Sequence, residues 1–229
     1  DRIQALTSVA DLTEWAKTGI LEGLPGPFSL GVIQDMADSN RYVVHLGRPG
    51  LILPDRTYYE PDHAQGQQLL AVYRQVALDL LALLGLDVKE AVELVTAGMA
   101  FDARLAPYTL SKEEAAEYVV FHNPRKLDQV AAYSDQIDFK AVLESVLGGL
   151  PETLNVGEPK FFEAFKQLVD QADLNELKAW LTLRLVTGAT SYLSEEARAI
   201  SHRMTQALTG NPAMRPFEKL AYSHVNQAF

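Results

Sequence analysis

The chain has 229 residues, of which 48% are hydrophobic and 22% are charged, and its formal net charge is −10. This composition is typical of a folded globular chain and excludes a disordered one. The acidic balance disfavours a surface that tracks phosphates, so we expect no nucleic-acid partner. No apolar run reaches the roughly 18 residues that a membrane span requires, so we expect no membrane partner either.

Cysteine is absent, which excludes disulfides, thiolate metal sites and a cysteine nucleophile. A chain without cysteine fits a reducing compartment, and we predict a cytoplasmic location. The sequence opens on Asp1 and Arg2, with neither a basic-then-apolar leader nor an initiator methionine. We therefore expect it to begin within a longer gene product.

Residues 1–60 are predicted to be a mixed segment with a short helix and short strands. Ser8, followed three residues later by Asp11, predicts the helix start. The Gly and Pro residues between positions 19 and 31 interrupt any helix, and Phe28 to Leu30 fits only a short extended piece. Residues 42–46 (Tyr-Val-Val-His-Leu) predict the one convincing strand, and Leu51 to Leu53 is a candidate to extend or pair with it.

Residues 61–229 have apolar residues at a period near 3.6, which predicts a helical domain. The fold class is therefore mainly α: a multi-helix bundle with a short β element near residues 42–53. Capping residues mark several helix starts, and the last predicted helix has no stop signal. The predicted caps are Asp87 with Glu90, Ser111 with Glu114, Asp138, Asp173 with Glu176, and Ser194.

Three further local predictions concern the middle of the chain. The helix that starts at Ser111 is predicted to end near Phe121. Asn123-Pro124 predicts the start of a short helix with proline in its first position. Residues 150–158 are predicted to be a loop.

A catalytic zinc on a helix needs two histidines one turn apart with a carboxylate between them, the His-Glu-x-x-His arrangement. The sequence does not contain it, and no two histidines are close enough to share a helical face. We interpret each as a surface or partly buried polar residue, and a site assembled from distant histidines stays an open alternative. The five are His45, His63, His122, His202 and His224.

Two other patterns have a structural and a functional interpretation. Glu113, Glu114 and Glu117 cluster at a predicted helix start, where capping and solvation compete with an acid–base pair. Residues 47–50 (Gly-Arg-Pro-Gly) are interpreted as a turn, because the lysine and hydroxyl of a phosphate-binding loop are missing. Gly-x-Ser-x-Gly, the common serine hydrolase motif, is absent.

The loop Pro54-Asp55-Arg56 combines a rigid proline, a turn-forming aspartate and a guanidinium. We interpret it first as a structural buttress. The alternative is an arginine that faces a peptide-binding cavity. With no stronger candidate, the sequence predicts no catalytic, cofactor-binding or metal-binding residue in this chain.

This loop belongs to a series of segments that resembles one enzyme family. Residues 45–59 (His-Leu-Gly-Arg-Pro-Gly-Leu-Ile-Leu-Pro-Asp-Arg-Thr-Tyr-Tyr) resemble the Gly-Leu-Gly-Leu-Pro-Asp-Arg-x-Tyr-Tyr segment of the neprilysin-like zinc metallopeptidases. Residues 101–106 resemble the family's Phe-Glu-x-x-Leu-Ala helix, and residues 121–127 its Tyr-Asn-x-x-x-Leu turn. Segments at 158–162, 177–180, 192–194 and 207–210 follow in the family's order. The sequence from Glu158 to Gly210 is most similar to that of the bacterial oligoendopeptidase O branch.

The resemblance implies a role without chemistry for this chain. Family members carry His-Glu-x-x-His and a glutamate ligand in their C-terminal half, so the zinc belongs to the parent protein and this chain alone is not an enzyme. What is present corresponds to the helical domain that faces the catalytic domain across a closed cavity. The implied partners are the catalytic C-terminal domain of the same polypeptide and short peptide substrates.

Three hypotheses follow from the sequence. The first is the domain of a zinc endopeptidase that walls the chamber and limits substrate size. The second is a free-standing helical protein-interaction module without peptidase activity. The third is an unrelated enzyme whose site is assembled from scattered carboxylates.

Overall fold

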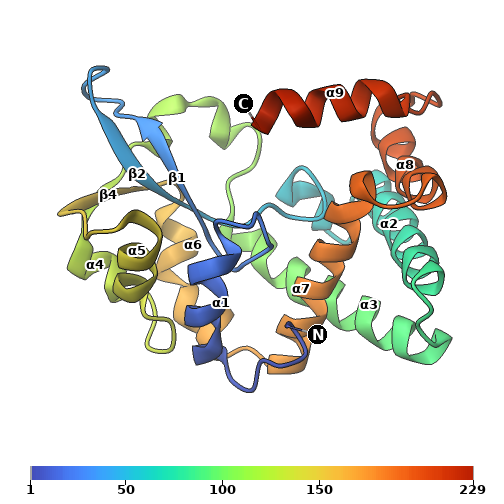
Figure 1. Ribbon diagram of the computed structural model, residues 1–229, viewed down its shortest axis with the longest axis horizontal. Helices are drawn as coiled ribbons and strands as arrows, with labels where there is room; N and C mark the ends of the chain where they lie inside the picture. The colour runs from blue at the N-terminus through green and yellow to red at the C-terminus, as the bar shows by residue number, and fades with distance from the viewer. Residues whose placement is uncertain (1, 229) are drawn as a thin grey trace.

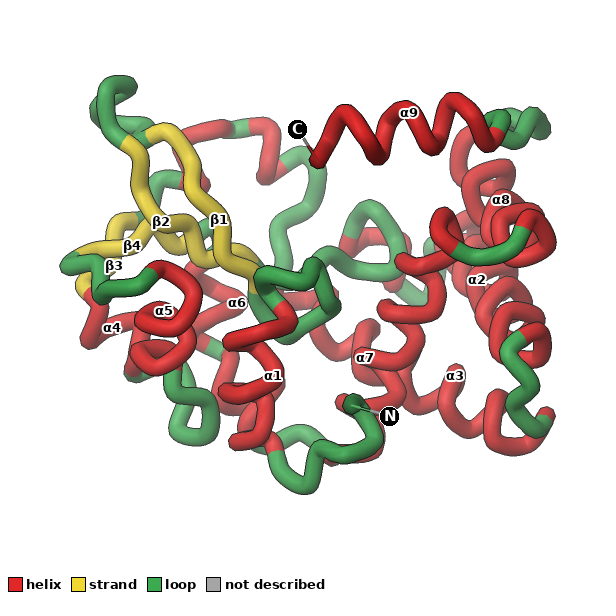
Figure 2. Tube along the Cα trace, viewed as in Figure 1, coloured by secondary structure: helices red, strands yellow, loops and turns green. Residues whose placement is uncertain are grey.

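The computed structural model describes residues 2–228. Most of them are helical, and one small sheet lies at the left end of the molecule (Figure 1). The tube in Figure 2 shows the strands gathered at that end and helices through the rest. The prediction of a mainly α fold is thus confirmed. No helix among the described residues combines the length and the apolar character that crossing a bilayer requires.

The structure contains α-helices and several short 3₁₀ or π turns. The α-helices are α1 (Leu12–Gly19), α2 (Ala64–Leu83), α3 (Val88–Leu105), α4 (Leu127–Ala131), α5 (Phe139–Leu147), α6 (Pro159–Glu163), α7 (Leu174–Gly188), α8 (Glu195–Thr209) and α9 (Phe217–Ala228). The 3₁₀ turns are η1 (Val9–Asp11), η2 (Arg56–Tyr59), η3 (Ala106–Tyr108), η4 (Glu114–Ala116), η5 (Tyr118–Phe121) and η7 (Ala189–Tyr192), and η6 (Lys166–Asp170) is a π turn.

The predicted caps begin four of these helices. Each side-chain oxygen accepts a backbone N–H of the first turn, which would otherwise have no partner. Asp87 caps α3 at 2.8 Å from Lys89 N, and Asp173 caps α7 at 2.8 Å from Asn175 N. Asp138 and Ser194 cap α5 and α8 in the same way.

The sheet has four strands in the order β1-β2-β4-β3. β1 (Ser29–Gln34) and β2 (Tyr42–Gly47) form an antiparallel hairpin, β4 (Thr153–Val156) runs parallel to β2, and β3 (Pro124–Lys126) is antiparallel to β4. The predicted strand at residues 42–46 is therefore confirmed. The sheet joins segments from both sides of residue 60, and the division of the chain at that residue stays a prediction.

Two segments near the sheet were predicted wrongly. Residues 150–158 were predicted as a loop, yet they contain β4, which the parallel pairing with β2 stabilises over a long sequence separation. Pro124 was predicted to start a helix, yet it starts β3, and α4 begins three residues later at Leu127. In both cases a long-range pairing overrides the local pattern.

Residues 51–53 do not form a strand, so the predicted extension of the β element is wrong. The backbone N–H of Ile52 donates to Asp102 and that of Leu53 donates to Tyr59, both at 3.0 Å. Because these two backbone N–H groups donate to side chains, they are not available to pair with another strand.

The segment from Ser111 to Phe121 is not one helix, which corrects the prediction. It forms the two 3₁₀ turns η4 and η5, and Glu117 between them has an extended backbone at φ −81° and ψ 94°. The cap predicted at Ser111 exists, because Glu114 N donates to Ser111 Oγ at 3.2 Å. It stabilises a single turn only.

The main core lies between the sheet, α1, α5, α6 and α7, and a second core joins α2, α3 and α7. Buried aromatic rings fill the first, with Phe28 and Phe139 at 4.8 Å between ring centroids. α3 crosses α7 closely at Gly98, where an added Cβ would lie 2.6 Å from Leu183 Cδ1. The fold thus fixes the loops that emerge between α3, α7 and the sheet.

Candidate functional site

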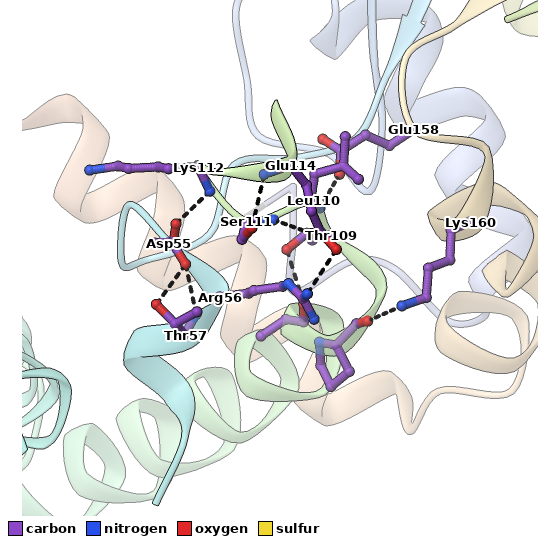
Figure 3. Close-up of polar contacts among 12 residues, drawn as sticks. Asp55, Arg56, Thr57, Thr109, Leu110, Ser111, Lys112, Glu114, Glu158 and Lys160 are labelled. Carbon is purple, nitrogen blue, oxygen red and sulfur yellow. Dashed lines mark hydrogen bonds and ion pairs between the residues drawn. The ribbon is translucent and has the colours of Figure 1, made fainter. Parts of the chain in front are cut away.

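Asp55 in the predicted buttress loop joins two loops that are distant in sequence. Its Oδ1 accepts hydrogen bonds from N and Oγ1 of Thr57, both at 2.8 Å, and its Oδ2 accepts one from Lys112 N at 2.6 Å (Figure 3). Burial alone raises the pKa of this carboxyl, but the hydrogen bonds from Thr57 and Lys112 hold the pKa below its ordinary value. The carboxylate is therefore held in its charged form.

Arg56 extends from the same loop to Glu114, with 3.0 Å between Nη2 and Oε1. The other oxygen of Glu114 accepts the backbone N–H of Ser111 at 2.7 Å. That hydrogen bond first, and the Arg56 charge second, lower the pKa of Glu114. Glu114 therefore acts as a cap and an ion-pair partner, which agrees with the capping interpretation.

The side chain of Glu158 makes a further contact to the loop that contains Leu110. It is 8% exposed, and it accepts Arg48 Nε at 2.6 Å and the backbone N–H of Leu110 at 2.7 Å. Lys160 also donates to the carbonyl of Pro107 at 2.8 Å. Figure 3 shows Asp55, Arg56 and Glu158 reaching, from separate segments, the stretch that carries Leu110, Lys112 and Glu114.

Asp102 on α3 anchors the start of the same loop. It is fully buried and accepts hydrogen bonds from Trp180 Nε1 and Ile52 N, both at 3.0 Å, and from the hydroxyl of Tyr59. Burial raises the pKa of Asp102, and the three donors oppose that rise. The loop is thus fixed at one end by Asp102 and in its middle by Asp55, as a buttress requires.

A pocket of about 290 Å³ opens beside this loop. Its walls are mainly apolar, and Arg56 and Glu60 are the charged side chains in it. Arg56 Nε is shielded from solvent and has no hydrogen-bond partner among the described residues. The lining residues are Arg56, Tyr59, Glu60, Pro61, Ala103, Ala106 and Pro107.

Residues 113–123, which we call the strap, continue from these anchors toward the sheet. At the far end Asn155 on β4 accepts Asn123 N at 2.7 Å and donates to the carbonyl of Phe121 at 2.8 Å. Between its two fastened ends the strap is mostly exposed, and Tyr118 and Val119 are 72% and 71% exposed.

Two of the histidines, His45 and His122, lie near Asn155, whereas His63 and His202 belong to other elements. His45 lies on β2 beside Asn155, and His63 caps α2 by accepting Gly66 N at 3.0 Å. His122 lies in the strap, and His202 on α8 is 3.2 Å from the carbonyl of Pro212. The side chain of His224 lies outside the described residues.

No three His, Asp or Glu side chains of the described residues lie together as metal ligands. No chemical step is assigned to zinc here, and the expectation that this chain holds no metal ligand stays a prediction. The exposed Glu113 and Glu117 lie in the strap. In the loop of residues 47–50, the carbonyl of Gly50 accepts Arg184 Nη1 at 2.6 Å, which fits a structural turn.

The sequence model of Peptidase family M13 for the amino-terminal region matches residues 1–229, the whole chain. The chain belongs to this family, and the resemblance to neprilysin-like zinc metallopeptidases is confirmed.

Curated relatives of the chain include bacterial and mammalian proteins. The chain is 33% identical over 222 residues to a "Putative zinc metalloproteinase in scaA 5'region" of Streptococcus gordonii, covering 97% of this chain and 39% of that protein. It is 31% identical over 195 residues to a "Neutral endopeptidase" of Lactococcus lactis subsp. cremoris, covering 85% of this chain and 31% of that protein. The chain thus spans 39% and 31% of the length of these two relatives.

Solved structures share the fold. PepO from Lactobacillus rhamnosis superposes with a TM-score of 0.83 at 23% identity, over 98% of this chain and 36% of that one. Zinc metalloprotease Zmp1 of Mycobacterium tuberculosis in its open state gives 0.87 at 23% identity, over 98% of this chain and 35% of that one.

Sequence reasoning identified Asp55, Arg56 and Glu114 but missed the buried polar groups that complete the network. Asp102 and Trp180 stand at apolar positions of helical stripes, where an acid or an indole N–H needs a buried partner. That need is readable from the sequence, but the identity of the partner is not. Asn155 and Glu158 lay in a segment predicted to be a loop.

Proposed function

We propose that this chain is the non-catalytic helical domain of a neprilysin-like zinc endopeptidase, walling its substrate chamber and limiting substrate size. The observation that carries the proposal is the family match over residues 1–229 in a chain that spans 39% and 31% of two relatives. The two relatives are named a zinc metalloproteinase and a neutral endopeptidase. Their length leaves ample room for a catalytic part elsewhere in the parent.

The loops fastened by hydrogen bonds favour the proposed role as a chamber wall. A wall that excludes folded proteins must hold its shape, and here buried carboxylates fasten the loops between helices at Asp55, Asp102 and Glu158. A rigid multi-helix bundle around a zinc site would exclude bulky substrates by size and restrict water around a bound peptide.

The partners in this proposal are the catalytic part of the same polypeptide, which holds the zinc, and short peptides. Large apolar side chains exposed on the described surface are consistent with a further surface covering them. Tyr118 and Val119 in the strap and Phe217 and Val225 on α9 are between 56% and 72% exposed. A cytoplasmic location and a division into residues 1–60 and 61–229 belong to the same proposal.

The proposed wall function can be tested by producing the two parts of the enzyme separately. This chain and the remainder of the parent polypeptide are produced separately, and hydrolysis of a short peptide and of a folded protein is measured for each part and for the mixture. We expect no hydrolysis and no stoichiometric zinc binding by this chain alone. We expect the mixture to cleave the short peptide and leave the folded protein intact.

Two outcomes would contradict the proposal. One is tight zinc binding or peptide hydrolysis by this chain alone. The other is a remainder that cleaves peptides with the same size limit whether or not this chain is added.

The alternative of a free-standing interaction module makes a different prediction about the gene. Its reading frame would stop near Phe229, with no His-Glu-x-x-His downstream. Sequencing the gene beyond that codon separates the two proposals.

A further inference from the structure

The side chain of Asn155 holds the downstream end of the strap, together with the backbone N–H of Val156, which donates to the carbonyl of Asn123 at 2.9 Å. Oδ1 accepts the N–H of Asn123 at 2.7 Å, and Nδ2 donates to the carbonyl of Phe121 at 2.8 Å. One contact needs an acceptor and the other a donor, so a single orientation of the amide satisfies both. Asn155 is 5% exposed, which shields these bonds from water.

That orientation determines the protonation state of His45. Nδ2 of Asn155 lies 3.1 Å from Nδ1 of His45, and an amide nitrogen can only donate. Nδ1 must therefore accept, so the imidazole is neutral and carries its proton on Nε2. Burial lowers the pKa of His45, which favours the same neutral form.

No charged side chain named around His45 favours a protonated Nδ1. β1 places the uncharged Gly31 opposite it. Just past the ends of β2 and β4, the charged residues Arg48 and Glu158 pair with each other at 2.6 Å. The strap contributes His122, and none of these described side chains offers Nδ1 of His45 an acceptor.

We propose that protonation of His45 loosens the downstream end of the strap. When Nδ1 takes up a proton, two donors face each other, and Asn155 can no longer keep its bonds to Asn123 and Phe121. The strap then loses its two bonds to Asn155 at Phe121 and at the N–H of Asn123. The carbonyl of Asn123 still accepts Val156 N at 2.9 Å, and Asp55 and Glu158 still hold the residues before the upstream end of the strap. The exposed Tyr118 and Val119 change from fixed to mobile positions.

The direction of the pH dependence follows from the neutral form. The fold prefers the unprotonated ring, so the strap is held above the ordinary histidine pKa of about 6.5 and released as the pH falls below it. This inference concerns only residues of this chain and does not depend on the proposed function.

Amide hydrogen exchange of the whole chain, corrected for the intrinsic rate, tests the release between about pH 4.5 and pH 7.5, a range that brackets histidine titration. We expect protection of the Asn123 N–H to fall about tenfold toward the acid end, the order expected when ordinary hydrogen bonds are lost. The N–H of Lys112, which Asp55 holds, should keep its protection and serves as an internal control. Flat protection of Asn123 over this range would overturn the proposal.

A matched pair of variants isolates His45. H45N keeps an acceptor near the position of Nδ1 but cannot gain a proton, so protection of Asn123 should no longer depend on pH. H202N, on the distant helix α8, should retain the wild-type dependence. A pH dependence that persists in H45N overturns the proposal.

A third measurement needs no variant. The ring of His45 is titrated by NMR in the wild-type chain, and its midpoint should coincide with the loss of protection at Asn123. Two distinct midpoints would overturn the proposal even if H45N failed to fold.

Discussion

Asp102 on α3 and Trp180 on α7 are joined by a hydrogen bond of 3.0 Å between Oδ1 and Nε1, and both side chains are fully buried. The second oxygen of the carboxylate accepts the N–H of Ile52 and the hydroxyl of Tyr59. One side chain thus connects two helices and the loop that resembles the family's Leu-Pro-Asp-Arg segment. Removing it leaves three donors without a partner.

The variant D102A should therefore be strongly destabilised. Leaving buried donors unsatisfied costs about 1–3 kcal/mol for each group, so we expect a loss of about 3 kcal/mol or more in the free energy of unfolding. Urea denaturation of the chain measures it. D135A is the matched control, because Asp135 is 71% exposed in its pair with Lys166 and should change stability by less than about 1 kcal/mol. Equal losses in the two variants would show that Asp102 is not the anchor described.

The crossing of α3 and α7 predicts opposite effects for two glycine-to-alanine changes. In G98A the new Cβ would lie 2.6 Å from Leu183 Cδ1 and 3.1 Å from the backbone of Ala179. We expect a loss of about 1–3 kcal/mol from overpacking, larger than the gain in helix propensity. In G188A at the end of α7 the Cβ meets open space, so a small gain of up to about 1 kcal/mol is expected. Thermal unfolding of both variants checks the pair, and a neutral G98A would mean that the helices can separate.

Asp11 predicts a defined loss of stability in acid. Its carboxylate accepts the N–H of Thr7 at 2.6 Å, the hydroxyl of Thr7 and the N–H of Ser8, and these bonds lower its pKa to about 2. Because the folded-state pKa is below the ordinary value of 3.8, the stabilisation is complete above that value and is lost as the pH falls toward 2.

The variant D11N cannot titrate at this position. Its urea midpoint should be below that of the wild type near neutral pH, and the gap should close as the pH falls to about 2. The variant E113Q, at an exposed strap residue, is the control for removing one surface carboxylate. A gap between D11N and the wild type that stays constant across the acid range would contradict the assignment.

The helices could be predicted from the sequence because their stabilising features are local. Asp87 and Asp173 are followed within three residues by the N–H groups they cap, and the apolar period of 3.6 marks the buried face. β4 could not be predicted in this way. Its four residues carry no strong strand pattern, and it exists because β2, more than a hundred residues earlier, lies beside it.

The same distinction applies to the candidate site. Pro54-Asp55-Arg56 could be identified from turn chemistry, and Glu114 from its spacing to Ser111. The partners that give the loop its role lie elsewhere: Lys112 is 57 residues from Asp55, and Asp102 is 50 residues from Ile52. No periodicity or spacing specifies such pairs, since they depend on how α3 packs against α7.

The pair Arg48–Glu158 provides the last prediction, because it is far better shielded than the chain's surface pairs. The side chains are 21% and 10% exposed at 2.6 Å, and Glu158 also accepts the N–H of Leu110. By contrast, Lys140 and Asp128 pair at the same distance with 44% and 87% exposure. Water screens the second pair more strongly than the first, so their coupling energies should differ.

Double-mutant cycles measure the two couplings directly. We use R48M with E158Q, since glutamine keeps an acceptor for Leu110, and K140M with D128N as the matched surface cycle. We expect a coupling of about 1–3 kcal/mol for the first pair and below about 1 kcal/mol for the second. Comparable couplings in both cycles would mean that Arg48 does not fasten the region near the strap through Glu158. In that case Glu158 would contact that segment through the backbone bond from Leu110 only, and E158A would destabilise the chain no more than loss of that one acceptor requires.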